Sequence, residues 1–277
     1  MSRHTDVLGL AMGDKTHISW TADEDGRRGA TWNFVHGCER VSPGCTFCYI
    51  ELQPPLRMTG MRFNGHQVGA TTGVRLRPEV LTKPMHWRRP RKIFTNRLSD
   101  TFHDAIPSEV LAKAWAVMAC CPDHTFQILT KRHGRMRSVL SRPDFRDEVD
   151  EEITQLMRAA KPPGRCWPVT LDRTTDDGWN IWGPAQWTLP WAWIGVTAED
   201  QDWLERRWSA LRATPAALRW LSCEPLLGPI RLCRCDGAAF EIKRHPFLVH
   251  PECPLHVAAR RCQGQLGGCW RGVGADR

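Results

Sequence analysis

The sequence predicts a mixed α/β fold in which parallel strands alternate with helices, and three observations support this. Four short apolar runs of strand type are separated by longer stretches, several with helical periodicity, between residues 91 and 222. A polar segment follows each run where the strand would end. The 277 residues, 42% of them hydrophobic, are enough for one large α/β domain. Because parallel strands end at one edge, these polar segments should converge there.

The expected elements follow a simple order along the chain. Strand-like runs at 18–20 and 30–34 flank a charged turn, and the main strands are expected at 91–95, 125–130, 191–197 and 218–222. Helices are expected at 108–118, with a serine at its start, at 145–160 and at 203–211. These elements predict a main domain over residues 18–230.

Three segments fall outside this pattern. Residues 1–17 are expected to be a disordered N-terminus, and 161–190 an irregular insertion rich in Pro, Gly and Trp. Residues 231–277 form a tail rich in Cys and His. The predicted organisation is therefore one domain with an insertion and a C-terminal extension.

Three cysteines in one loop, Cys38, Cys45 and Cys48, are the most informative feature of the chain. Their spacing is C-x6-C-x2-C, within a segment that also carries Gly, Ser and Pro. Three thiolates hold three irons of a [4Fe–4S] cube and leave the fourth iron open. A closed zinc site wants a fourth protein ligand, for which His36 is the nearby candidate. A cluster is the main prediction, and zinc or reduced structural cysteines are the alternatives.

The overall composition narrows the class of protein. The formal net charge is +8, and basic clusters lie at 83–92, 131–137 and 260–261. This charge predicts a polyanionic partner such as nucleic acid, with a solvated basic surface as the alternative. No apolar run reaches the length of a membrane helix, so no membrane partner is expected. No export signal is recognised, so a reducing cytoplasmic location is expected, where the twelve cysteines favour metal ligands or free thiols.

Five ordered motifs carry a family resemblance. They are WNxxxGCxxVSPGCxxCY at 32–49, SDxFH at 99–103, HTFQILTKR at 124–132, GVTAEDQ at 195–201 and SCEPLLG at 222–228. Together they resemble a phage-associated family of unknown function that is related to the radical S-adenosylmethionine (SAM) enzymes. The resemblance implies a partial (β/α) barrel of radical SAM type whose first loop binds a [4Fe–4S] cluster. It also implies that SAM chelates the open iron and is cleaved, on reduction, to a 5′-deoxyadenosyl radical.

Two features depart from that family pattern. The usual radical SAM spacing is C-x3-C-x2-C, whereas the first gap here is six residues. Relatives continue after the fifth motif into an apolar strand that ends in GGESG, whereas residues 257–277 of this chain show no convincing strand. An incomplete or inactive copy is therefore one of the alternatives.

Four residues that follow the second and third strands are the candidate catalytic groups. Asp100 and His103 are predicted to contact SAM or substrate or to transfer a proton, with a capping role for Asp100 as the alternative. Lys131 and Arg132 are predicted to bind a carboxylate or phosphate, with an ordinary surface pair as the alternative.

Two glutamates, Glu199 and Glu224, occupy matching positions after the last two strands. They are predicted to bind the cofactor, at the ribose or the ammonium group of SAM. Because Pro225 follows Glu224, a plain turn is the alternative there.

The tail carries a second metal-ligand pattern. Cys233 and Cys235 form one close pair and Cys253 and His256 another, which predicts a small zinc site; free thiols are the alternative. The remaining cysteines, at 120, 121, 166 and 223, are expected to be structural.

Three functions stay open from the sequence. The leading hypothesis is a radical SAM-type iron–sulfur enzyme that acts on nucleic acid or a nucleotide. The second is a metal-stabilised nucleic-acid-binding protein without catalysis, and the third is a degenerate, inactive family member.

Overall fold

A computed structural model describes residues 16, 18–23, 25–158 and 188–230, together with four short strands outside these ranges. These strands are β6 (Asp172–Thr175), β7 (Gly178–Asn180), β10 (Phe247–Val249) and β11 (Trp270–Gly272). The rest of the predicted N-terminus, insertion and tail lies outside the described residues.

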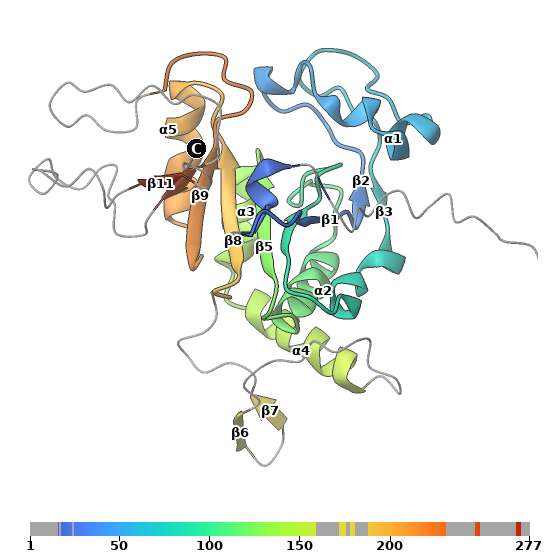
Figure 1. The fold of residues 1–277 in the computed structure, drawn as a ribbon, viewed down its shortest axis with the longest axis vertical. Helices are drawn as coiled ribbons and strands as arrows, with labels where there is room; N and C mark the ends of the chain where they lie inside the picture. Colours follow the sequence, from blue (N-terminus) through green and yellow to red (C-terminus); the bar gives the residue numbers. More distant parts are fainter. Residues whose placement is uncertain are drawn as a thin grey trace, which may run out of the picture.

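One sheet forms the centre of the protein (Figure 1). Five neighbouring strands run parallel, each paired with the next along the chain. They are β1 (Ala30–Trp32), β4 (Lys92–Thr95), β5 (Thr125–Thr130), β8 (Ala192–Thr197) and β9 (Leu218–Ser222). β10 pairs antiparallel with β9, and β11 with β10. The prediction of a parallel α/β sheet is confirmed, but the expectation of no strand in 257–277 is wrong, because β11 lies there.

Four longer helices connect the parallel strands. They are α2 (Ser108–Ala119), α3 (His133–Leu140), α4 (Phe145–Arg158) and α5 (Gln201–Arg212). Because crossovers between parallel strands are right-handed, a strand order that follows the sequence puts these helices on one face of the sheet. The described strands form an open sheet with β1 and β11 at its edges, so a barrel is not established.

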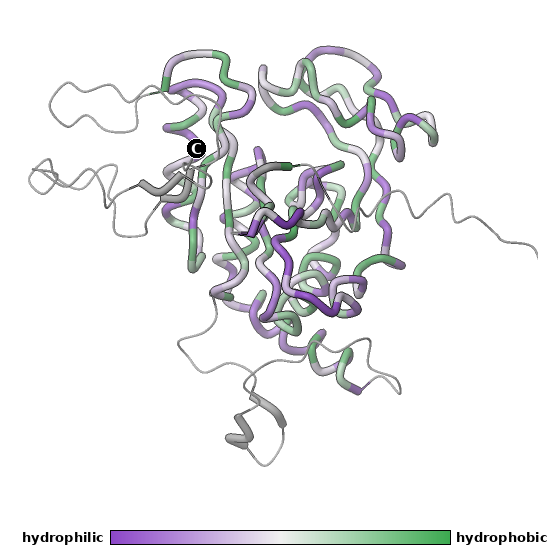
Figure 2. Tube along the Cα trace, in the orientation of Figure 1, coloured by the Kyte–Doolittle hydropathy of each residue, from purple (hydrophilic) through white to green (hydrophobic). Residues whose placement is uncertain are grey.

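Alternation along the strands separates the two faces. Residues of one face pack with the helices in the main core, as Ile93, Ile128 and Ile194 do. In Figure 2 hydrophobic and hydrophilic residues are interspersed along the strands and helices, and successive side chains of a strand point to opposite faces. On the opposite face, the Trp20 ring centroid lies 4.6 Å from that of Phe94. The short 3-10 helix η2 (Ser19–Thr21) therefore covers this face, and the predicted strand at 18–20 is wrong.

Short elements build the segment between β1 and β4. β2 (Val35–His36) pairs antiparallel with β3 (Arg75–Leu76). The others are 3-10 turns and one short helix: η3 (Pro43–Cys45), η4 (Tyr49–Leu52), α1 (Pro54–Met58), η5 (Pro78–Val80) and η6 (Lys83–His86). This segment and the loop after β9 lie at the same end of the sheet (Figure 1). Within the described part of the chain, no helix is long and apolar enough to cross a membrane.

Candidate functional site

The cysteine loop, defined here as residues 37–49, is anchored to the segment that follows β4. The Gly37 N–H donates to the Leu98 carbonyl at 3.0 Å, and the Ser99 hydroxyl donates to the Gly37 carbonyl at 2.5 Å. Gly37 adopts φ +85°, a backbone conformation that glycine takes without strain. The start of the loop is thereby fixed at the carboxyl end of β4.

A buried arginine inside the loop holds its later half. Arg40 is 2% exposed, and its guanidinium donates to the carbonyls of Cys45 and Thr46. It also lies over the ring of Phe63, 3.8 Å from the ring centroid. Sequence reasoning missed Arg40, although an arginine between two candidate metal ligands is a signal that could have been followed.

Glu199, which follows β8, joins the cysteine loop to the sheet. Its side chain is 0% exposed, and Oε1 accepts from Ser42 Oγ at 2.7 Å, Lys131 Nζ at 2.6 Å and Arg207 Nη1 at 3.1 Å. Burial raises the pKa of Glu199, but Lys131 and Arg207 outweigh it and hold that pKa below its ordinary value. The carboxylate is therefore charged, and its Oε1 accepts all three hydrogen bonds, whereas its Oε2 is buried and has no hydrogen-bond partner among the described residues. Sequence reasoning missed Ser42 and Arg207.

Gly44 packs directly against this carboxylate. A Cβ added at Gly44 would lie 2.7 Å from both Cδ and Oε1 of Glu199, closer than real contacts allow. Only glycine therefore lets the loop approach the end of β8 this closely.

Asp100 fastens the segment after β4 to the end of β5. Its Oδ1 accepts from Thr130 Oγ1 at 2.6 Å and from the Phe102 N–H at 2.9 Å, and its Oδ2 accepts from the Lys131 N–H at 2.9 Å. Pro107 occupies the N-cap of α2, so Asp100 caps its own turn and not the following helix. Both carboxylate oxygens are engaged within the protein, and a catalytic role for Asp100 stays a prediction.

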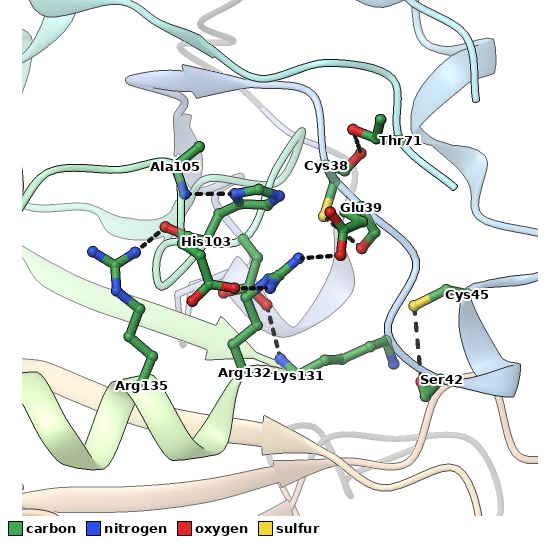
Figure 3. Close-up of polar contacts among 12 residues, drawn as sticks. Cys38, Glu39, Ser42, Cys45, Thr71, His103, Ala105, Lys131, Arg132 and Arg135 are labelled. Atoms are coloured by element: carbon green, nitrogen blue, oxygen red, sulfur yellow. Dashed lines mark hydrogen bonds and ion pairs between the residues drawn. The ribbon is translucent and has the colours of Figure 1, made fainter. Parts of the chain in front are cut away.

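Arg132 and His103 lie next to one another beside the cysteine loop (Figure 3). Arg132 Nη1 donates to Asp104 Oδ2 at 2.5 Å, and its Nη2 lies 3.7 Å from Glu39 Oε1. His103 is 5% exposed; burial, with a contribution from Arg132, lowers its pKa, so the ring is neutral near pH 7. Arg132 and Lys131 both bind carboxylates of the protein itself, which makes them more than a surface pair.

The three cysteines share one neighbourhood. Cys38 and Cys48 pack against the apolar cluster of Ile50, Leu56 and Leu98, and Ser42 Oγ lies 3.8 Å from Cys45 Sγ. Burial raises the pKa of Cys38, and Asp100 and Cys48 raise it further, while burial also raises that of Cys48. Both are therefore thiols in the metal-free protein, and metal binding would release their protons.

The donor set was compared with the metals that the sequence predicts. Three thiols on a loop with apolar cover match the ligands of a cluster, in which each cysteine binds a different iron. His36 Nε2 lies 3.3 Å from Arg77 Nη1, and burial lowers the pKa of His36 to about 4, so this nitrogen is engaged away from the loop. Among the residues that the structure describes, no group of three or more His, Cys, Asp or Glu side chains could hold a metal ion as it stands.

The other predicted site residues differ in their setting. Glu224 is exposed at the start of the loop after β9, unlike the buried Glu199. The predicted zinc ligands Cys233, Cys235, Cys253 and His256 lie outside the described residues, so that site stays a prediction. Of the predicted structural cysteines, the three described ones are buried: Cys120, Cys121 and Cys223.

Comparison with known proteins gives a family and no function. Residues 15–242 match DUF5131, a family described as a protein of unknown function. The chain belongs to this family. No curated protein and no solved structure matches.

The match covers the whole site. All five sequence motifs, from the cysteine loop to the segment after β9, fall inside it. The predicted family of unknown function is thus confirmed at this level, while the phage association and the radical SAM relationship stay predictions.

Proposed function

We propose that this DUF5131 protein is an iron–sulfur protein of radical SAM type, with the cluster held by Cys38, Cys45 and Cys48. One observation carries the proposal: the three-cysteine loop is fixed over the carboxyl ends of a parallel sheet by Glu199, Ser42 and Arg40. In parallel α/β folds this edge is where ligands bind, because the loops that follow the strands meet there. None of the three cysteines is exposed, and a buried, charged carboxylate anchors the loop that carries them.

The proposed fold is a partial (β/α) barrel. Support comes from the sequential strand order, which is the order in which a (β/α) barrel is wound, and from helices on one face. Trp20, Phe94 and Trp220 contact one another on the face of the sheet opposite the helices, which would be the inner face of such a barrel.

The residues of the chain have separate proposed roles. Three thiolates leave the fourth iron open for SAM, whose reductive cleavage is the chemistry that the cluster supplies when it is bound. Arg40 and Glu199 hold the loop in register with the strands. The exposed Glu224 is free to accept from a ligand amine or hydroxyl, whereas Glu199 is buried and its Oε1 already accepts from Lys131.

The proposed substrate is a nucleic acid or nucleotide. The net charge of +8 favours a polyanion, and Phe47, 94% exposed between two of the cysteines, offers a ring on which a base can stack. The proposed location is the cytoplasm, where thiols stay reduced.

Titration with SAM tests the enzymatic part of the proposal. SAM should change the visible spectrum of the iron-loaded protein and bind measurably by calorimetry. Glu224→Gln should weaken SAM binding roughly ten- to a hundredfold, the cost of about 1.5–3 kcal/mol for one charge-assisted hydrogen bond, with iron content unchanged. Glu205→Gln, an exposed change on α5, is the matched control.

The opposite result has a clear meaning. If iron-loaded wild-type protein shows neither a spectral change nor heat on addition of SAM, the chain is not a working radical SAM enzyme. Salt-sensitive nucleic-acid binding in that same sample would favour the non-catalytic alternative.

A further inference from the structure

His103 carries a buried nitrogen whose role nothing above explains. Its Nδ1 accepts a hydrogen bond from the Ala105 N–H at 3.1 Å. Its Nε2 is buried and has no hydrogen-bond partner among the described residues. Buried polar atoms are normally paired, so an unpartnered one next to a candidate site indicates a missing interaction.

The first hydrogen bond determines what the second nitrogen can do. A ring nitrogen that accepts an N–H carries no proton, so the neutral imidazole has its proton on Nε2. Nε2 is then a donor and not a metal ligand, and it requires an acceptor.

Two carboxylates near the His103 ring, Asp100 and Glu39, already have partners of their own. Asp100 already accepts three hydrogen bonds from Thr130, Phe102 and Lys131. Glu39 faces Arg132. Figure 3 shows the free edge of the His103 ring turned toward the Cys38 sulfur. Both residues also lie within electrostatic range of Asp100 and Arg132, so they share one environment.

We infer that the His103 Nε2–H donates a hydrogen bond to the sulfur of Cys38 when that sulfur binds the metal centre. This inference rests on the proposed iron–sulfur function and assigns His103 as a positioning residue, acting through Cys38. A hydrogen bond to a ligating thiolate withdraws electron density from the sulfur and stabilises the more negative, reduced cluster. His103 therefore raises the reduction potential of the cluster.

Two substitutions in the full chain separate the hydrogen bond from the shape of the ring. His103→Phe keeps a ring but removes the donor, and it should shift the oxidised-to-reduced ratio about tenfold, which is about 59 mV toward lower potential for a one-electron couple. His103→Gln keeps an N–H donor near the position of Nε2 and should stay closer to the wild-type potential. His66→Gln, an exposed change in the same region of the chain, is the control and should leave the potential unchanged. Equal potentials in the wild-type, His103→Phe and His103→Gln proteins would overturn the inference.

A second measurement does not depend on iron. ¹⁵N NMR of the metal-free protein with labelled histidine should show His103 with its proton on Nε2. A proton on Nδ1 overturns the inference whatever the iron content. Wild-type protein that binds no iron would instead defeat the proposed function, with the NMR result still deciding where the His103 proton lies.

Discussion

Replacing Glu199 with glutamine should destabilise the protein severely, because it removes a negative charge that pairs with two cations. In the folded protein the Oε1 atom of Glu199 accepts from Lys131 at 2.6 Å, Arg207 at 3.1 Å and Ser42 at 2.7 Å. Glutamine has nearly the same shape and keeps an acceptor oxygen, so packing changes little. What changes is that Lys131 and Arg207 lose the carboxylate with which each forms an ion pair.

The size of the effect follows from burial. Breaking a buried ion pair by removing one partner costs about 3–5 kcal/mol. Glu199 and Arg207 are both 0% exposed, but Lys131 is 19% exposed and can be partly hydrated, so we expect the lower end of that range. Ser42→Ala removes one hydrogen bond to the same carboxylate and should cost about 1.5–3 kcal/mol.

Urea unfolding of the Glu199→Gln protein, at neutral and at acid pH, measures this. Since the pKa of Glu199 in the folded protein lies below its ordinary 4.5, the carboxylate contributes stability above that pH and loses it as the pH falls through the lower value. The difference between wild-type and Glu199→Gln proteins should therefore shrink in acid. Glu205→Gln, an exposed control on α5, should stay within about 0.5 kcal/mol of wild type. A loss below about 1 kcal/mol for Glu199→Gln at neutral pH would refute the reasoning.

Two further substitutions test other parts of the structure. Gly44→Ala places a methyl group against the Glu199 carboxylate and should lower the stability of the protein by about 1–3 kcal/mol. The control Gly134→Ala adds a methyl group that meets nothing within 4 Å and should raise the stability by about 0.5–1 kcal/mol. Thermal unfolding measures both variants, and equal effects would contradict the close approach of Gly44 to Glu199. Burial raises the pKa of Asp150 from its ordinary value of 3.8 to about 6. The carboxyl group therefore contributes to the stability of the fold below pH 3.8, and this contribution is lost as the pH rises through about 6. Since the side chain is 34% exposed, Asp150→Asn should stabilise the protein by only about 1 kcal/mol above neutral pH and by nothing in acid, and a pH-independent difference would contradict this assignment.

The regular part of the fold was predictable because local patterns determine it. The apolar runs that form β4, β5, β8 and β9 were found within one residue of their ends, as was the start of α4. Residues 18–20 were wrongly predicted to be a strand, since Trp20 is held by contacts with Phe94 and Trp220, which are far away in sequence. Helix α3 was missed because its sequence is basic and its apolar stripe short.

The sequence predicts where the site lies in the fold, but not which of its side chains contact one another. Parallel strands dictate that the segments at Asp100, Lys131 and Glu199 meet. The sequence does not show that Lys131 donates a hydrogen bond to Glu199, 68 residues away, or that Arg207 on α5 donates to the same carboxylate. The cofactor contact predicted for Glu199 stays a prediction, and the structure adds that its side chain also holds the cysteine loop through Ser42.

Iron and acid-labile sulfide analysis of anaerobically reconstituted protein tests the central claim most directly. Wild-type protein should hold about four iron and about four sulfide atoms per chain, as a [4Fe–4S] cluster requires. The variant with Cys38, Cys45 and Cys48 all replaced by alanine should hold almost none and keep its fold, as judged by circular dichroism. Wild-type protein without iron, or equal iron in the triple variant, would contradict the account.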